Sequence, residues 1–495
     1  MPDLNAPVIV LFRDDLRLGD NPALHVATST NAPVIPVFVL DEESGGLRPR
    51  GAAWRWWLHQ SLLALSADLA NFGSTLILRR GAMADVVPEI VRQTGAAAVF
   101  WNRRYEAASQ AADEEALKSA GVPVRTYNAN LLNEPWEIKT REGRPFRVYT
   151  AYWRACLARG LQNAPLPRPS AITYYSGPAI ESDSLDRWGL LPTRPDWAGG
   201  MRETWTPGEG GAYERLYEFV DHKLSGYAAH RDEPQTDITA RLSPHLSHGE
   251  ISPRQIWAML DHPELAAHQA SISKFLGELG WREFAYHFLN QHPDLATRNV
   301  QTRFDEFGWM SSEGMLRAWQ TGQTGYPIVD AAMRELWQTG WMHNRLRLIV
   351  GSFLVKHLLI DWRLGEQWFW DTLVDSDPAN NALNWQWVAG TGADSAPYFR
   401  IFNPVLQGQR FDPEGEYIRR FVPELAELPG RYVHEPWRAP ERILKAAGVV
   451  LKETYPRPIV DHQLARNRAL SAFHALRNVD PEAEGAAATD DSLPL

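Results

Sequence analysis

The architecture can be read first from residues 8–40, VIVLFRDDLRLGDNPALHVATSTNAPVIPVFVL, because this segment begins and ends with a short apolar run. Val8–Phe12 and Val34–Leu40 have the length and the β-branched content of strands that are buried on both faces. Further apolar runs occupy Leu76–Arg79, Ala97–Trp101 and Val122–Tyr127. Helical patterns occupy Ala52–Phe72, Ala84–Thr94 and Ala107–Ala120, between these runs. Alternating units of this kind predict a doubly wound parallel sheet, a Rossmann-like α/β domain.

The loops after these expected strands lack the G-x-G-x-x-G pattern of dinucleotide-binding domains. The crevice of such a sheet suits a small planar ligand, but the fold alone does not identify one.

The rest of the chain changes character twice. Residues 160–211 contain seven Pro and eight Gly and little periodicity, which predicts an irregular linker. From Ala212 onward the pattern is helical, with starts at Ser252-Pro253 and Tyr326-Pro327. We therefore expect an α/β domain at 1–135, a linker at 136–211, an all-α domain at 212–478 and an acidic, disordered tail at 479–495.

Composition excludes several function classes. Cys156 is the single cysteine among 495 residues, so an intrachain disulfide, a four-Cys zinc site and a Cys-ligated iron–sulfur cluster are excluded. The 15 histidines show no metal-ligand spacing, and we expect no metal. A Walker loop, a Ser nucleophile elbow, a secretion signal and an apolar run of about 20 residues are also missing from the sequence, which favours a cytoplasmic protein without a membrane partner.

Charge and aromatic content point in different directions. The formal net charge of −10 argues against a nucleic-acid partner, whereas 21 Trp, of which 11 lie between Trp257 and Trp387, indicate more than ordinary core packing.

Four polar clusters have both a structural and a functional interpretation. Asp375 to Asn381 could line a ligand or form a capped turn. Arg345, Arg347 and Lys356 form the best local basic patch, which fits a phosphate contact or a solvated helix face. Glu278, Trp281 and Arg282 share one helix face, as an intrahelical Glu–Arg pair beside a core Trp or as a stacking platform for a flat ligand. Thr239 to Ser243 is a hydroxyl-rich segment before a helix, which fits a helix cap or a phosphate contact.

Several blocks of sequence resemble the DNA photolyase/cryptochrome family, specifically a microbial cyclobutane pyrimidine dimer photolyase. They are FRDDLRLGDNPAL (Phe12–Leu24), TARLSPHLSHGEISPRQ (Thr239–Gln255), ELGWREF (Glu278–Phe284), TGYPIVDAAMRELWQTGWMHNRLR (Thr324–Arg347), SFLVKHLLIDWRLGE (Ser352–Glu366) and NWQWVAGTGADSAPYFRIFNPVLQGQRFD (Asn384–Asp412). The resemblance covers about residues 7–478 and raises the functional interpretations above the structural ones.

The resemblance implies FAD inside the helical domain. It places phosphate contacts at Tyr227 and Thr239–Ser243, and contacts near the ribose and flavin at Asp375–Asp377. Arg347 matches the residue that pairs with the first of these acids, and Asn381 matches the position opposite flavin N5. The cofactor-binding set is Tyr227, Thr239, Ala240, Arg241, Leu242, Ser243, Arg347, Asp375, Ser376, Asp377 and Asn381.

The resemblance also implies a pocket for a flipped lesion in UV-damaged DNA. Trp281 and Trp387 match the indoles that sandwich the dimer, and Glu278 matches the carboxyl group at a thymine edge. Further DNA contacts are implied at Arg231, Arg282, Asn344, Arg345 and Gln407. The catalytic set is Trp385, Trp362 and Trp309 as an electron relay, with Asn381 and Glu278.

The implied activity is light-driven repair by a monomer, in which excited reduced FAD transfers an electron to the dimer and recovers it. A cryptochrome and a (6-4) photolyase are the alternatives; Asn344 and Leu348 stand where the latter resembles histidines. An antenna chromophore is also implied, either methenyltetrahydrofolate or an 8-hydroxy-deazaflavin. Ala107-Ala108-Ser109 departs from the Asn-Glu pair of one folate-binding type, so the identity of the antenna stays open.

Overall fold

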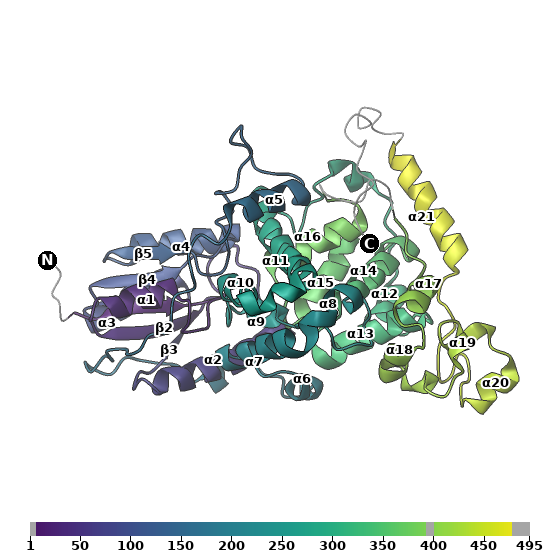
Figure 1. Ribbon diagram of the computed structural model, residues 1–495, viewed down its shortest axis with the longest axis horizontal. Helices are drawn as coiled ribbons and strands as arrows, with labels where there is room; N and C mark the ends of the chain where they lie inside the picture. The colour runs from purple at the N-terminus through teal and green to yellow at the C-terminus, as the bar shows by residue number, and fades with distance from the viewer. Residues whose placement is uncertain (1–5, 393–399, 478–495) are drawn as a thin grey trace.

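A computed structural model of the chain describes residues 6–392 and 400–477. Figure 1 shows an α/β domain at one end of an elongated molecule and a larger helical region at the other. The strands are β1 (Val8–Phe12), β2 (Val34–Leu40), β3 (Ile77–Arg80), β4 (Ala98–Asn102) and β5 (Val124–Tyr127). They form one parallel sheet in the order β3-β2-β1-β4-β5, which confirms the doubly wound architecture.

The sheet is buried on both faces because each strand supplies apolar side chains in both directions. In β1, Val10 and Phe12 join the core beneath α1 and α2, whereas Ile9 and Leu11 join the core beneath α3 and α4. The helices of this domain are α1 (Pro22–Ser29), α2 (Ala52–Ala70), α3 (Met83–Thr94) and α4 (Ala107–Ser119).

Helix α1 was not expected from the sequence, although its start carries a standard signal. Asn21 is the N-cap and its side chain accepts a hydrogen bond from the Leu24 amide at 3.1 Å, while Pro22 occupies the first turn. The helix is only eight residues long, so its apolar periodicity was too short to stand out.

The helical region is built around two large apolar cores, one centred on α13 to α16 and the other on α11. The expected start at Ser252 is confirmed as a capping box with Gln255. Its α-helices are α5 (Tyr149–Arg159), α6 (Gly199–Thr204), α7 (Glu209–Glu218), α8 (Leu224–His230), α9 (Ser243–Ser247), α10 (Pro253–Leu260), α11 (Gln269–Leu289), α12 (Glu313–Gln320), α13 (Pro327–Thr339), α14 (Asn344–Ser352), α15 (Trp362–Thr372), α16 (Pro378–Ala389), α17 (Pro404–Phe411), α18 (Glu416–Phe421), α19 (Gly430–Val433), α20 (Glu441–Ala446) and α21 (His462–Arg477). Two π-helical turns, η2 (Phe219–Lys223) and η5 (Phe353–His357), continue α7 and α14.

Residues 136–211, expected as a linker, are more ordered than their composition indicates. Helix α5 lies inside this range and packs Tyr152, Trp153 and Cys156 into the α11 core. The stretch from Gly160 to Gly208 is irregular apart from α6 and one short 3-10 turn, as its Pro and Gly content predicts. The acidic tail at 479–495 lies outside the described residues.

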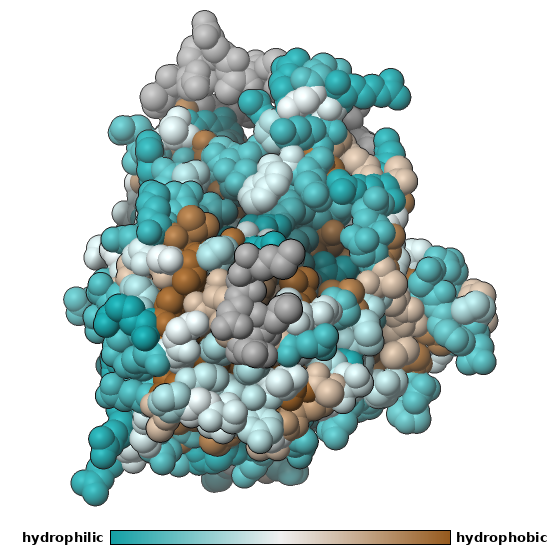
Figure 2. Space-filling view, turned by 90° about the vertical axis from the view of Figure 1, so that its left-hand side faces the viewer, coloured by the Kyte–Doolittle hydropathy of each residue, from teal (hydrophilic) through white to brown (hydrophobic). Residues whose placement is uncertain are grey.

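The face of the molecule shown in Figure 2 is mainly hydrophilic. Teal residues predominate there and the hydrophobic ones gather in small groups. Among the described residues, every helix is too short or too polar to cross a bilayer.

Candidate functional site

Asp375 and Arg347 form the centre of the candidate site. Asp375 follows the end of α15, and its Oδ2 lies 2.7 Å from Nη2 of Arg347 on α14. Arg347 Nε also donates to the Met342 carbonyl at 2.8 Å, which fixes the guanidinium. The second carboxylate oxygen of the buried Asp375 has no hydrogen-bond partner within the described part of the chain.

Asp377 has a structural role that Asp375 lacks. As N-cap of α16, it accepts hydrogen bonds through Oδ1 from the amides of Ala379 and Asn380, at 3.0 and 2.7 Å. Its Oδ2 accepts a bond from the Tyr286 hydroxyl at 2.5 Å. The capped-turn interpretation is therefore correct for Asp377, whereas Asp375 remains available to a ligand.

Further buried polar atoms in this part of the helical region have no partner among the described residues. They are Nε of Arg241, Nε2 of His343, Oγ of Ser376 and Nε1 of Trp385. An unsatisfied buried polar atom costs about 1–3 kcal/mol, so a native protein rarely carries several without a ligand or water. The mixture of donors and acceptors fits a large polar cofactor such as FAD.

The Thr239–Ser243 segment has an unusual backbone at Arg241, whose φ is +50°. Left-handed residues other than glycine concentrate at functional sites. The Arg241 guanidinium lies 5.0 Å from the Trp341 ring centroid and 3.4 Å from an Asp237 carboxylate oxygen. Ser243 does not cap α9; it is the first helical residue, and its hydroxyl accepts a bond from Trp341 Nε1 at 3.1 Å.

Tyr227, the other expected phosphate contact, is buried. Its ring packs edge-on against Phe219 and Phe275, and the Arg231 guanidinium lies 5.5 Å from its centroid. Burial raises the pKa of the Tyr227 hydroxyl, which therefore stays a neutral donor at physiological pH.

Asn381, in the first turn of α16, has a defined amide orientation. Its Nδ2 donates to the Glu366 carbonyl at 3.0 Å and to Glu366 Oε1 at 2.8 Å. Both amide hydrogens are used, which leaves Oδ1 as an acceptor. Helix α16 packs against α11, α14 and α15, so Asn381 and Asp375 belong to one region of the fold (Figure 1).

Glu278 and Trp281 lie on α11 with different partners from those the helix spacing indicated. Glu278 Oε1 pairs with Arg231 Nη1 at 2.6 Å, whereas Arg282 Nη1 donates to the Asn130 carbonyl at 2.7 Å. The interpretation of Glu278 and Arg282 as an intrahelical pair is therefore wrong. Arg282 instead joins α11 to the α/β domain. One face of the half-buried Trp281 stacks on Tyr149, with ring centroids 3.7 Å apart and planes 10° from parallel.

The expected basic patch is smaller than the sequence indicated. Arg345 pairs with Asp232 at 2.9 Å, and Arg347 belongs to the Asp375 cluster. Lys356 is buried and donates to the Arg400 carbonyl; burial lowers its pKa to about 7, so it is not part of a surface patch. Asn344 is exposed at the start of α14, while Trp387 on α16 and Gln407 on α17 are half-buried.

The three tryptophans predicted as an electron relay belong to or pack against one apolar core. Trp362 is fully buried and donates through Nε1 to Asn299 Oδ1 at 2.9 Å. Trp385 is buried and lies edge-on to Phe369, and Trp309 is half-buried against Phe307. Their positions in the sequence carry no common spacing, so only the tertiary structure brings them together.

Five residues with a direct part in this arrangement were missed by the sequence reasoning. Four of them contact predicted residues and the fifth, Arg48, contacts one of those four, Glu366. The five are Arg48, Glu366, Tyr149, Asp232 and Tyr286. Asp232 and Tyr286 lie near expected site residues in sequence, but no pattern distinguished them from other polar residues.

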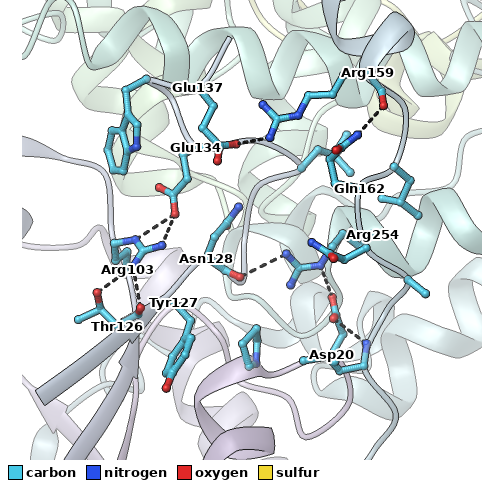
Figure 3. Close-up of a pocket in the computed structure, with 17 residues that line it drawn as sticks. Asp20, Arg103, Thr126, Tyr127, Asn128, Glu134, Glu137, Arg159, Gln162 and Arg254 are labelled. Carbon is cyan, nitrogen blue, oxygen red and sulfur yellow. Dashed lines mark hydrogen bonds and ion pairs between the residues drawn. The ribbon is translucent and has the colours of Figure 1, made fainter.

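A separate cavity of about 730 Å³ lies at the carboxyl ends of β4 and β5, where the α/β domain meets the helical region. Figure 3 shows that its charged side chains are paired with one another. Arg103 bonds Glu134 and Thr126, Arg159 pairs with Glu137, and Arg254 pairs with Asp20. Of these pairs, Arg254–Asp20 joins the helical region to the α/β domain. We assign no ligand to the cavity.

Comparison with known proteins agrees with these observations. Residues 8–170 match a family model described as DNA photolyase, and residues 275–475 match one described as the FAD binding domain of DNA photolyase. The chain is 50% identical to a deoxyribodipyrimidine photo-lyase of Agrobacterium fabrum over 95% of this chain and 98% of that protein. It is 38% identical to Cryptochrome-1 of Arabidopsis thaliana, over 97% of this chain and 72% of that protein.

A crystal structure of a bacterial class III photolyase from Agrobacterium tumefaciens superimposes with a TM-score of 0.93 at 49% identity, covering 96% of this chain and 98% of that one. The agreement in sequence, in fold and in the FAD-binding domain extends over nearly the whole chain, and the protein belongs to the DNA photolyase and cryptochrome family.

Proposed function

We propose that this protein repairs cyclobutane pyrimidine dimers in DNA when illuminated, using FAD held in the helical region. The observation that carries the proposal is the unpartnered carboxylate oxygen of Asp375, together with further buried polar atoms of the helical region that have no partner among the described residues; this set fits a large polar cofactor. The 50% identity to a deoxyribodipyrimidine photo-lyase supports the same activity.

When bound, reduced FAD supplies the chemistry of light-driven electron donation to the dimer and recovery of that electron. The protein positions this cofactor: Tyr227 and the Thr239–Ser243 segment would hold its phosphates, and Asp375 with Arg347 would hold the flavin and ribose region. The Oδ1 of Asn381 is an acceptor, which suits an N–H of the reduced flavin, and the neutral amide does not repel an anionic form.

Trp281 and Trp387 would stack on the two pyrimidines of a dimer flipped out of the duplex. Tyr149 covers one face of Trp281, so the indole is held rigid and offers its other face to the lesion. Dimer pyrimidines are already poorly stacked in DNA, and extruding them costs less than extruding normal bases. Selectivity for damage follows from this difference.

The charges at the proposed DNA contacts are moderated by neighbouring acids. Arg231 pairs with Glu278, and Arg345 with Asp232. A weakly charged surface reduces binding to undamaged duplex, which depends on phosphate neutralisation. This reconciles the net charge of −10 with a DNA substrate.

Trp385, Trp362 and Trp309 would carry electrons between the interior and the surface when the resting cofactor is reduced. This role is separate from the repair step, which needs light, the reduced cofactor and the lesion.

The test is illumination of the reduced protein with an oligonucleotide that contains one thymine dimer, compared with the same mixture in the dark. We expect thymine recovery in light only, and no repair of an oligonucleotide with a (6-4) lesion. Absence of thymine recovery, with flavin present and reducible by light, would favour a photoreceptor of the cryptochrome kind instead.

A further inference from the structure

Arg48, from the segment between β2 and α2, reaches across the domain boundary to Glu366 on α15. Its Nη1 and Nη2 lie 2.7 and 2.9 Å from Oε1 and Oε2 of Glu366, a two-point contact between guanidinium and carboxylate. The Glu366 side chain is only 3% exposed. A carboxylate so far removed from water needs a paired cation to stay ionised.

Glu366 is also the residue that orients Asn381. An ionised carboxylate can only accept hydrogen bonds, so Oε1 of Glu366 requires the NH2 group of Asn381 to face it. The Glu366 carbonyl accepts the second amide hydrogen. A protonated Glu366 could instead donate to the amide oxygen, and the side chain of Asn381 could then turn over.

We propose that Arg48 of the α/β domain is a positioning residue for the flavin: through Glu366 it holds the Asn381 amide with its oxygen free to accept a hydrogen bond from the cofactor. This inference rests on the proposed function, because it takes Asn381 to lie beside the flavin. It gives the α/β domain a direct influence on the cofactor of the helical region, in addition to any antenna it carries.

The other charged groups on the elements that pack against α15 have different partners. Arg55 on α2 pairs with Glu42, and His59 on α2 lies 3.6 Å from Asp186. On η5, Lys356 bonds the Arg400 carbonyl and His357 bonds His462. Helix α16 carries no charged residue between Pro378 and Ala389, and Asp377 before it is bonded to Tyr286. Arg48 is the cation in contact with Glu366 among the residues that the structure describes.

Arg50 provides a matched control. Both arginines lie over the Trp370 ring, at 4.3 Å for Arg48 and 5.2 Å for Arg50, but Arg50 pairs with Asp14 at 3.5 Å. The segment keeps other attachments to α15 when either arginine is replaced. Trp370 Nε1 donates to the Pro49 carbonyl at 2.8 Å, and the Ala52 amide donates to Asp371 Oδ1 at 3.0 Å.

The experiment compares purified flavin-containing wild type with Arg48→Gln, Arg48→Lys, Arg50→Gln and the double variant Arg48→Gln/Glu366→Gln. The midpoint potential of the bound flavin is measured from about pH 5.5 to 8.5, a window chosen because a buried carboxyl without its cation titrates well above its usual range. The quantity compared is the difference in potential between each variant and the wild type at the same pH.

We expect the difference for Arg48→Gln to change with pH in one single-proton step, as Glu366 gains and loses a proton. The step should be smaller in Arg48→Lys, which keeps the charge without the two-point contact, and should be missing from Arg50→Gln and from the double variant. If Arg48→Gln does not retain flavin, Arg48→Lys is compared with Arg50→Gln instead. A pH-dependent difference in potential is then expected in Arg48→Lys and not in Arg50→Gln.

If the wild type repairs dimers but the difference in flavin potential is constant across the pH range in both Arg48 variants, the role of Arg48 is overturned. The proposed function is unaffected by that result. A wild type without flavin or without light-driven repair would overturn the proposed function, and with it the premise of this inference.

Discussion

The two domains each contain a buried polar cluster, and the clusters differ in whether the oxygens of their buried aspartates find partners within the protein. In the α/β domain, Arg13 bonds Asp113 and the Asn102 carbonyl, while Asp15 accepts from the Arg13 amide and from Asn102. In the helical region, Asp375 and its neighbours keep several atoms without a partner among the described residues.

The difference shows where a resident ligand fits. The Arg13 cluster lies after β1 and β4, where the strand order reverses and where open α/β sheets usually bind ligands. Side chains of the protein fill that position here: burial opposes ionisation of Asp113, but Arg104 and Arg13 together lower its pKa. Asp375 is paired with Arg347 through one oxygen only, and its other oxygen has no partner among the described residues, so we assign the cofactor to the helical region.

The largest effect is expected from Asp375→Asn. The substitution removes the charge that Arg347 pairs with, and loss of one partner of a buried charged pair costs about 2–5 kcal/mol, or roughly 30- to 5000-fold in affinity for FAD. Affinity is measured by fluorescence titration of the apoprotein with FAD. Asp371→Asn, on the exposed side of α15, is the control and should retain FAD; equal affinities in the two variants would remove Asp375 from the site.

Arg13→Gln should lower stability without releasing FAD. Breaking a buried ion pair costs about 3 kcal/mol or more, because Asp113 and Asp15 lose a cation in a dry interior. Denaturant unfolding gives the stability, and absorbance gives the FAD content per chain. The exposed Arg80, which pairs with Glu42, is the control, and Arg80→Gln should change stability by less than about 1 kcal/mol. Loss of FAD in Arg13→Gln alone would contradict the separation of the two clusters.

Trp281→Ala should weaken binding of a dimer-containing duplex by about 1–3 kcal/mol, the range for one stacked base. The comparison is with Trp337→Ala, because Trp337 is 54% exposed and stacks only on Trp368 among the rings described. Band-shift titration with damaged and undamaged duplex measures the effect. If both variants bind the damaged duplex like the wild type, Trp281 does not contact the lesion.

The smallest effect on repair is expected from Trp385→Phe. Photoreduction of the oxidised flavin should slow strongly, because the proposed relay loses one of its three tryptophans. Repair by chemically reduced protein should be almost unchanged. Flash absorbance measures the first rate and dimer loss the second. Equal loss of both would contradict the separation of relay and repair.

The sequence predicted the sheet well because buried parallel strands are continuous apolar runs, and the ends of β1 and β2 match the expected residues. Local signals failed where contacts span the chain. Glu278 was paired with Arg282 on helix spacing, yet its partner Arg231 lies 47 residues earlier. Arg48 and Glu366 are 318 residues apart, and neither belongs to a recognisable spacing.

The candidate site was predicted through resemblance rather than through physical reasoning from the residues. Reasoning from the residues favoured a structural interpretation of the Asp375–Asn381 segment, and the structure confirms it for Asp377. Asp375 keeps one carboxylate oxygen without a partner among the described residues, and its role as a ligand contact stays a prediction. The distinction depends on which oxygen finds a partner in three dimensions, a fact that the sequence does not contain.

The most direct test of the central claim follows dimer content and flavin redox state together in one anaerobic sample of the reduced protein during illumination. We predict that many dimers per protein molecule are converted to thymines while the flavin stays reduced, because the electron returns after each repair. Dimer loss that stops after one equivalent as the flavin becomes oxidised, or no dimer loss at all, would contradict the account.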